Sequence, residues 1–135
     1  MSQRASGPFD VKLAPQALSD VAATSGLGRM SLDKVFHGDL DATSAGEMLS
    51  AMSPVKGSAA YVALERVTGS LHGRSGSFVL QHTGTMQRGT PSLVVTVAPD
   101  SGTEALEGLT GTMSIQIEGK AHFYTFDYAL PDPTA

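Results

Sequence analysis

Period-two alternation of apolar and polar residues, interrupted by tight-turn dipeptides, is the feature that most restricts the fold of this sequence. Phe9, Val11 and Leu13 alternate with charged residues, and residues 93–97 read Leu-Val-Val-Thr-Val. Such alternation and β-branched enrichment are typical of strands that bury one face. Sustained helical periodicity is almost absent, so the sequence predicts an all-β protein.

Eight strands are expected, most of them joined as antiparallel hairpins, and this pattern is typical of a barrel or sandwich. One short helical turn is expected at Glu104–Glu107, because Ser101 and Glu104 have the spacing of a capping box. The expected strands cover residues 9–13, 30–36, 43–52, 58–71, 77–87, 92–98, 111–118 and 121–130.

Length and composition limit the classes of protein to consider. The 135 residues fit a single β-barrel domain over 1–135, with 1–6 and 131–135 as loose tails. Neither a signal segment nor an apolar span of membrane length is apparent, which favours a cytoplasmic protein without a membrane role. The net charge of −4 comes without a basic cluster, so nucleic acid is not an expected partner. The absence of cysteine excludes thiolate catalysis and sulfur-ligated metals.

The first hairpin loop fixes which side chains share the inner face of the barrel. A two-residue loop at Gly73-Arg74 places Glu65 opposite His82 and Ala63 opposite Gly84. A buried carboxylate needs a partner, and His82 is the obvious one for Glu65. The two smallest side chains of this wall lie beside the pair and leave space in the interior.

Two further hairpin loops extend the same inner wall. A loop at Arg88-Gly89 places Val95 opposite His82, and a loop at Gly119-Lys120 places Ile115 opposite Tyr124. An apolar cavity with a few polar groups is the usual form of a small-molecule site. The expected lining is Tyr61, Ala63, Gly84, Leu80, Val95 and Tyr124.

No metal or cofactor site is predicted. The remaining histidines lack metal-ligand spacing, and a three-ligand site of Glu65, His82 and His122 is only geometrically conceivable. Glycines near Arg74 are explained by turn chemistry rather than by phosphate binding, because neither Gly-Lys-Ser nor Gly-Lys-Thr follows them.

Two long stretches carry a resemblance to a known family. Residues 57–69 and 73–86, together with 99–103 and the ending 122–128, resemble a bacterial family of small proteins of unknown function. Members of that family are similar to the allene oxide cyclase barrel. The resemblance implies an eight-stranded antiparallel barrel with a central cavity, and it supplies no activity.

Three hypotheses of function follow, and the sequence alone does not decide whether the protein is an enzyme. In the first, the barrel is an isomerase or cyclase in which Glu65 and His82 act as an acid–base pair. In the second, it binds a small apolar or amphipathic molecule without catalysis, and this pair is structural. In the third, it forms a homo-oligomer or binds another protein through its outer face. The apolar residues on that face are Val62, Leu64, Val79 and Val94.

Overall fold

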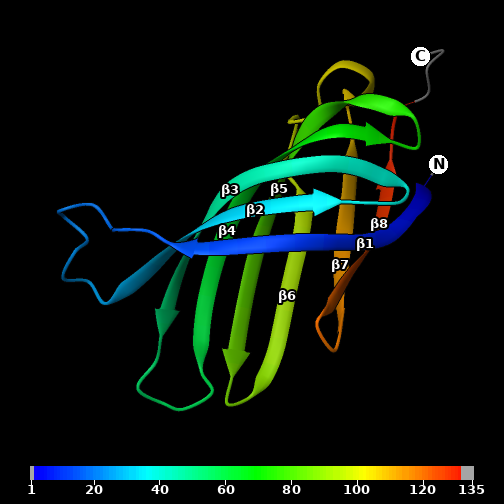
Figure 1. Ribbon diagram of the computed structural model, residues 1–135. Coiled ribbons are helices and arrows are strands. Elements are labelled where there is room, and N and C mark those ends of the chain that lie inside the picture. The colour runs from blue at the N-terminus through cyan, green and yellow to red at the C-terminus, as the bar shows by residue number, and fades with distance from the viewer. Residues whose placement is uncertain (1, 132–135) are drawn as a thin grey trace.

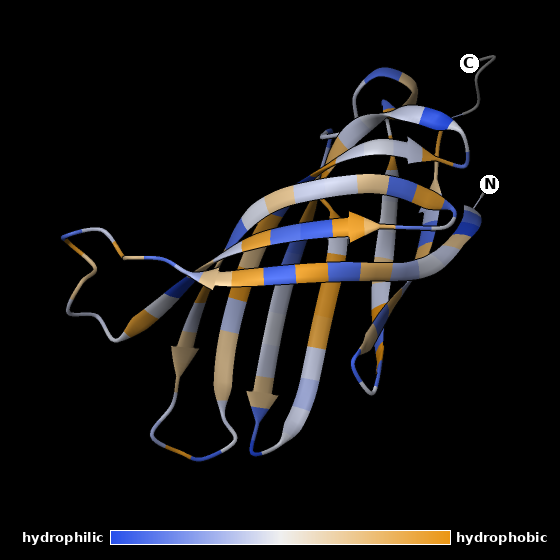
Figure 2. Cartoon of the chain, viewed as in Figure 1, coloured by the Kyte–Doolittle hydropathy of each residue, from blue (hydrophilic) through white to orange (hydrophobic). Residues whose placement is uncertain are grey.

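The computed structural model describes residues 2–131 and shows a closed barrel of eight antiparallel strands arranged in sequence order (Figure 1). The predicted all-β barrel is therefore confirmed. Hydropathy alternates along the strands, as is clear on β1 and β2 in Figure 2. The elements are β1 (Ser2–Pro15), β2 (Leu27–Phe36), β3 (Leu40–Met52), β4 (Ala59–Leu71), β5 (Arg74–Gln87), β6 (Thr90–Val97), η1 (Glu104–Leu106), β7 (Thr110–Glu118) and β8 (Ala121–Ala129).

The N-terminal segment is part of the barrel, so the expectation of a loose tail over 1–6 is wrong for its described residues. Strand β1 begins at Ser2 and pairs with β8 from Ser2↔Ala129 to Phe9↔His122, which closes the barrel. Small and polar residues gave this segment little strand signal, but tertiary pairing overrides weak propensity. The other expected tail lies beyond the described residues except for Pro131, which is exposed outside β8.

Aromatic side chains fill one end of the barrel interior. Phe78 stacks on Phe126 with ring centroids 5.7 Å apart, and Phe36 meets Tyr124 edge-on at 5.6 Å. The Tyr124 hydroxyl donates to the carbonyl oxygen of His37 at 2.6 Å and so has a partner in this apolar setting. This end of the interior is a packed core.

The barrel opens at its other end, where two pairs of neighbouring strands separate (Figure 1). The register of β6 with β7 holds two residue pairs, and the pairing of β1 with β8 ends at Phe9↔His122. Side chains beyond these points stay in phase with the core but are 40% to 65% exposed. They are Leu13, Met86, Leu93 and Ile117.

The β4–β5 turn consists of His72-Gly73, one residue earlier than the predicted Gly73-Arg74. Both turn residues have positive φ, 48° and 82°, which is the geometry of a type I′ hairpin turn. The pairing shifts by two residues, so Glu65 lies opposite Leu80 instead of His82. A two-residue shift keeps every side chain on its predicted face.

The other two predicted hairpin registers are confirmed. His82 lies opposite Val95 between β5 and β6, and Ile115 lies opposite Tyr124 between β7 and β8. These loops are therefore the two-residue connections that the sequence indicated.

The predicted helical turn is present as η1, but the capping box is not formed. Its N-cap is Thr103, whose side chain makes no capping hydrogen bond. The Ser101 hydroxyl instead donates to the carbonyl oxygen of Ala98 and accepts the backbone N–H of Val79. Leu106 of this turn is 1% exposed and joins the core.

Candidate functional site

Glu65 and His82 meet inside the barrel despite the shifted register. They lie diagonally across β4 and β5, with His82 Nε2 2.5 Å from Glu65 Oε2. Both side chains are buried, with exposed fractions of 1% and 4% for the two residues. The expected contact is therefore present, as a diagonal pair instead of a directly opposed one.

Two further side chains complete this buried ionic cluster, which consists of Lys34, Ser44, Glu65 and His82. Lys34 Nζ lies 2.8 Å from Glu65 Oε2, and the Ser44 hydroxyl donates to Oε1 at 2.7 Å. The ammonium group also lies 5.2 Å from the ring centroid of Phe9, within cation–π range. Each carboxylate oxygen thus accepts a hydrogen bond from the interior.

Sequence reasoning missed Lys34, although a signal for it was present. Met30, Leu32 and Phe36 are the apolar positions of an alternating strand, and Lys34 stands in phase with them. That phase places the ammonium group on the inner face, beside any carboxylate there. Ser44 gave no comparable signal, because a serine suits either face of a strand.

The ionic cluster holds Glu65 in its charged form. Burial alone raises the pKa of this carboxyl, but hydrogen bonds from His82 and Lys34 and their positive charges lower it to about 2. A general base for chemistry near neutral pH works best with a pKa near that pH. The geometry therefore suits a permanent internal ion pair better than a proton-transfer group.

The predicted lining residues lie inside the barrel, but the space expected among them is filled. Leu80, Val95 and Tyr124 are at most 2% exposed, and Ala63 is buried beside His82. The shifted register puts Tyr61 directly opposite Gly84.

The ring of Tyr61 covers Gly84 closely. A Cβ atom added at Gly84 would lie 2.2 Å from Cε1 of this ring. The tyrosine therefore occupies the volume that two small residues were expected to leave empty.

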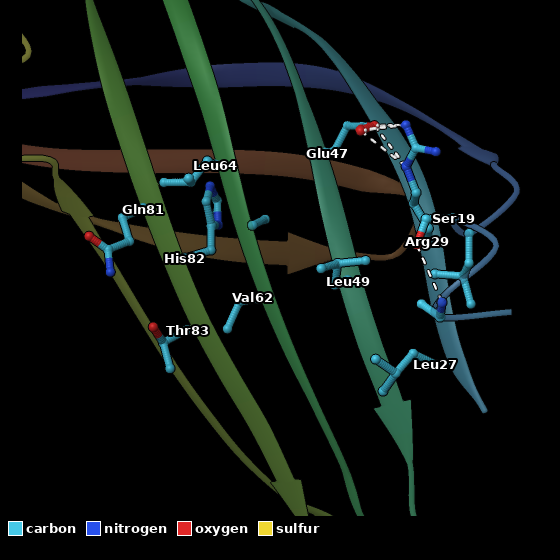
Figure 3. A pocket seen from close by; sticks show the side chains of 13 residues that line it. Ser19, Leu27, Arg29, Glu47, Leu49, Val62, Leu64, Gln81, His82 and Thr83 are labelled. Carbon is cyan, nitrogen blue, oxygen red and sulfur yellow. Dashed lines mark hydrogen bonds and ion pairs between the residues drawn. The ribbon is translucent and has the colours of Figure 1, made fainter. Parts of the chain in front are cut away.

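A hollow of about 700 Å³ lies on the outer face of the β2–β5 wall, bordered by the loop of residues 16–26 (Figure 3). Arg29 holds this loop in place: its Nη1 donates to the carbonyl oxygen of Ala17 at 2.6 Å, and its own carbonyl oxygen accepts the N–H of Gln16. The lining consists of Leu18, Ser19, Ala22, Leu27, Arg29, Glu47, Leu49, Val62, Ala63, Leu64, Gln81, His82 and Thr83.

The floor of this outer hollow is apolar and accessible. Leu49, Val62 and Thr83 form one cross-strand row, and Leu64 and Gln81 are partners in the next. The exposed fractions of Leu49, Val62 and Leu64 are 44%, 52% and 56%. Three large apolar side chains thus face solvent together within one concave surface.

The two charged residues at the rim of the outer hollow neutralise each other. The guanidinium of Arg29 forms a bidentate pair with Glu47, with N–O distances from 2.5 to 3.1 Å. The hydrogen bond from Arg29 lowers the pKa of Glu47, and the same contact raises the pKa of Arg29. Both groups therefore stay charged, and each charge is balanced by that of its partner.

Three of the four apolar residues predicted on the outer face are exposed. Val62, Leu64 and Val94 have exposed fractions of 52%, 56% and 56%. Val79 is half-buried, and the segment that follows β6 lies beside it, since the Ser101 hydroxyl accepts the backbone N–H of Val79. The outer face therefore carries the apolar surface that the alternation indicated, apart from this covered position.

His122 lies apart from the ionic cluster, with its ring packed against Phe9 at 5.4 Å. The described residues contain no group of three His, Cys, Asp or Glu side chains placed to hold a metal ion. Among residues 2–131 no helix is long and apolar enough to span a membrane.

Fold and site define a small closed antiparallel barrel with a buried ionic cluster and a hollow outer wall. The profile of a family described as protein of unknown function, DUF3224, matches residues 5–128, and the chain belongs to this family. A solved structure from Shewanella oneidensis MR-1, described as a protein with unknown function from the same family, is 51% identical. Its TM-score is 0.90, with 98% of this chain and 99% of that chain covered. Comparison with curated proteins finds no match.

These comparisons confirm the predicted resemblance to a family of unknown function. They carry no information on activity, since neither description names a ligand or a reaction. The likeness to allene oxide cyclases stays a prediction from the sequence.

Proposed function

We propose that this protein is a non-catalytic binding barrel that takes a small, mostly apolar molecule in the outer hollow. One observation carries the proposal: three half-exposed apolar side chains, Leu49, Val62 and Leu64, form the floor of a concave surface of about 700 Å³. Ligand sites for small molecules have volumes of about 300–1,000 Å³ and mostly apolar walls. A ligand seated here removes these side chains from water, which is the main source of its affinity.

Area favours a small molecule over a second copy of the chain as the occupant. The apolar face across β3–β6, which has Glu47 at one corner, spans three strand spacings of about 4.8 Å and four residue steps of about 3.4 Å, or roughly 200 Å². A stable protein–protein interface buries about 800 Å² on each partner. The face alone is too small for that, but it is sufficient for one ligand. The expectation of a homo-oligomer stays a prediction.

The ionic cluster supports a structural role rather than the acid–base role of the isomerase hypothesis. Lys34, Ser44 and His82 all point at Glu65, and no fully buried side-chain nitrogen or oxygen of the described residues lacks a partner. A carboxylate held by three donors is a weak base. The cluster then serves to fix the register and the interior of the barrel.

A pair of matched lysine substitutions tests the proposed site. Leu64→Lys places a charge on the floor of the hollow, at a position that is 56% exposed. Val35→Lys is the control, because it places a charge on the outer face of β2 between Asp10 and Thr43, outside the lining and at a position that is 39% exposed. With the neutral dye N-phenyl-1-naphthylamine as the probe, we expect Leu64→Lys to weaken binding at least tenfold. Val35→Lys should bind the dye like the wild type.

Two results would contradict the proposed function. One is the absence of dye binding to the wild type at dye concentrations that saturate an apolar binding site. The other is equal binding to both lysine variants, which would place the dye elsewhere on the molecule.

A further inference from the structure

We infer that the ligand of the outer hollow is an uncharged molecule, with an apolar body and a hydrogen-bonding group such as a hydroxyl or carbonyl. The inference rests on the proposed function, because it names the chemical class that the same hollow accepts. It follows from the charges and the free polar groups that line the site.

The lining offers no unpaired charge to a ligand. Arg29 and Glu47 compensate each other through their bidentate pair, and Arg29 also donates to the carbonyl oxygen of Ala17. The imidazole of His82 points inward to Glu65. A charged headgroup would therefore lose its hydration against an apolar floor without gaining a partner, which is costly.

The next cross-strand row of the outer face carries charged side chains, but none of them lines the hollow. Lys12, Asp33, Ala45 and Arg66 are successive cross-strand partners, so this row holds two bases and one acid. None of these residues belongs to the lining. The charged side chains that a ligand meets at the rim are therefore Arg29 and Glu47, which are paired with each other.

Two neutral side chains remain to receive the polar group of a ligand. The Gln81 amide and the Thr83 hydroxyl lie on β5 at the edge of the hollow, and Figure 3 shows both beside the apolar floor. Their side chains make no hydrogen bond with another described residue. The amide offers a donor and an acceptor, and the hydroxyl offers the same, which suits a neutral oxygen group.

Three probes of equal chain length test the ligand class: 1-decanol, decanoate and decyltrimethylammonium, each below its aggregation limit. Displacement of N-phenyl-1-naphthylamine from the wild-type protein gives their relative affinities. We expect decanol to bind at least tenfold more tightly than either ion. Equal affinity for decanol and one of the ions would overturn the inference while leaving the proposed function in place.

Substitution of a charged residue at the rim of the hollow provides a second test of the ligand class. Glu47→Gln leaves Arg29 without its counter-charge, so the affinity for decanoate should rise at least fivefold relative to the affinity for decanol. Asp127→Asn is the control, because it breaks the equivalent exposed pair with Arg4 away from the hollow.

The possible outcomes distinguish a wrong ligand class from a wrong proposed function. Unchanged decanoate affinity in Glu47→Gln, or an equal gain in Asp127→Asn, would overturn the inferred ligand class. Failure of all three probes and of the dye to bind the wild type would overturn the proposed function itself.

Discussion

At the scale of the residue, Glu65 is the side chain on which the interior of the barrel most depends. It is 1% exposed, yet its carboxylate accepts hydrogen bonds from Lys34, Ser44 and His82. Removing one partner of a buried ion pair lowers the stability of the fold strongly, because the charge of the other partner is then buried without compensation. The alternation of the sequence predicted Glu65 and His82 on the inner face, but it did not connect them to Lys34.

Substitution of Glu65 by glutamine should therefore destabilise the fold and spare the outer hollow. We expect Glu65→Gln to lower the free energy of unfolding by about 3–5 kcal/mol, because Lys34 loses its counter-charge in the interior. Urea denaturation measures this loss. Glu47→Gln is the matched control, since a solvent-exposed ion pair contributes little to the free energy of unfolding. A loss of dye affinity in folded Glu65→Gln, with little change in stability, would instead favour a functional pair.

Acid should remove the contribution of Glu65 in a defined range of pH. The folded-state pKa is about 2, below the ordinary value of 4.5, so the charged carboxylate stabilises the folded state at pH values above 4.5. That stabilisation, about 3 kcal/mol, is lost as the pH falls from 4.5 to 2. Unfolding free energies of the wild type and Glu65→Gln should converge over this range. Parallel curves would show that the carboxyl is not held in its charged form.

At the scale of the element, sequence predicted the strands better than their exact pairing. Two of the three hairpin loops were placed correctly, and the third differed by one residue, because His72-Gly73 forms the type I′ turn. Arg88-Gly89 follows the same pattern of a residue and a glycine, both with positive φ. Glycine in the second turn position is therefore the sequence signal for the register of both hairpins.

The β5–β6 turn gives a prediction about backbone conformation. Gly89 has φ of 90° and open space where a Cβ would lie, so Gly89→Ala adds strain without a clash. We expect it to lower the free energy of unfolding by about 1 kcal/mol. Arg88 has φ of 48°, and Arg88→Asn should raise stability by about 0.5 kcal/mol, because asparagine tolerates this region better. Thermal denaturation of both variants checks the opposite signs, and equal signs would contradict a type I′ turn.

At the scale of the whole molecule, sequence indicated the barrel but not the place of its hollow. Local alternation says which side chains face inward, and it correctly put Val62 and Leu64 on the outside. The hollow itself depends on the loop of residues 16–26, which Arg29 holds through the carbonyl oxygen of Ala17. Contacts between a loop and the outer face of other strands produce no periodic pattern of apolar residues in the sequence. The sequence therefore predicted a site in the interior, where Tyr61 fills the space.

The most direct test of the central claim is an NMR titration of the ¹⁵N-labelled wild-type protein with 1-decanol. Chemical-shift changes report where on the molecule the probe binds. The proposed function predicts that the largest changes occur at the floor and rim of the outer hollow, at Leu49, Val62, Leu64, Gln81 and Thr83. Largest changes at Met86, Leu93 and Ile117, which face the open end of the barrel, would contradict it.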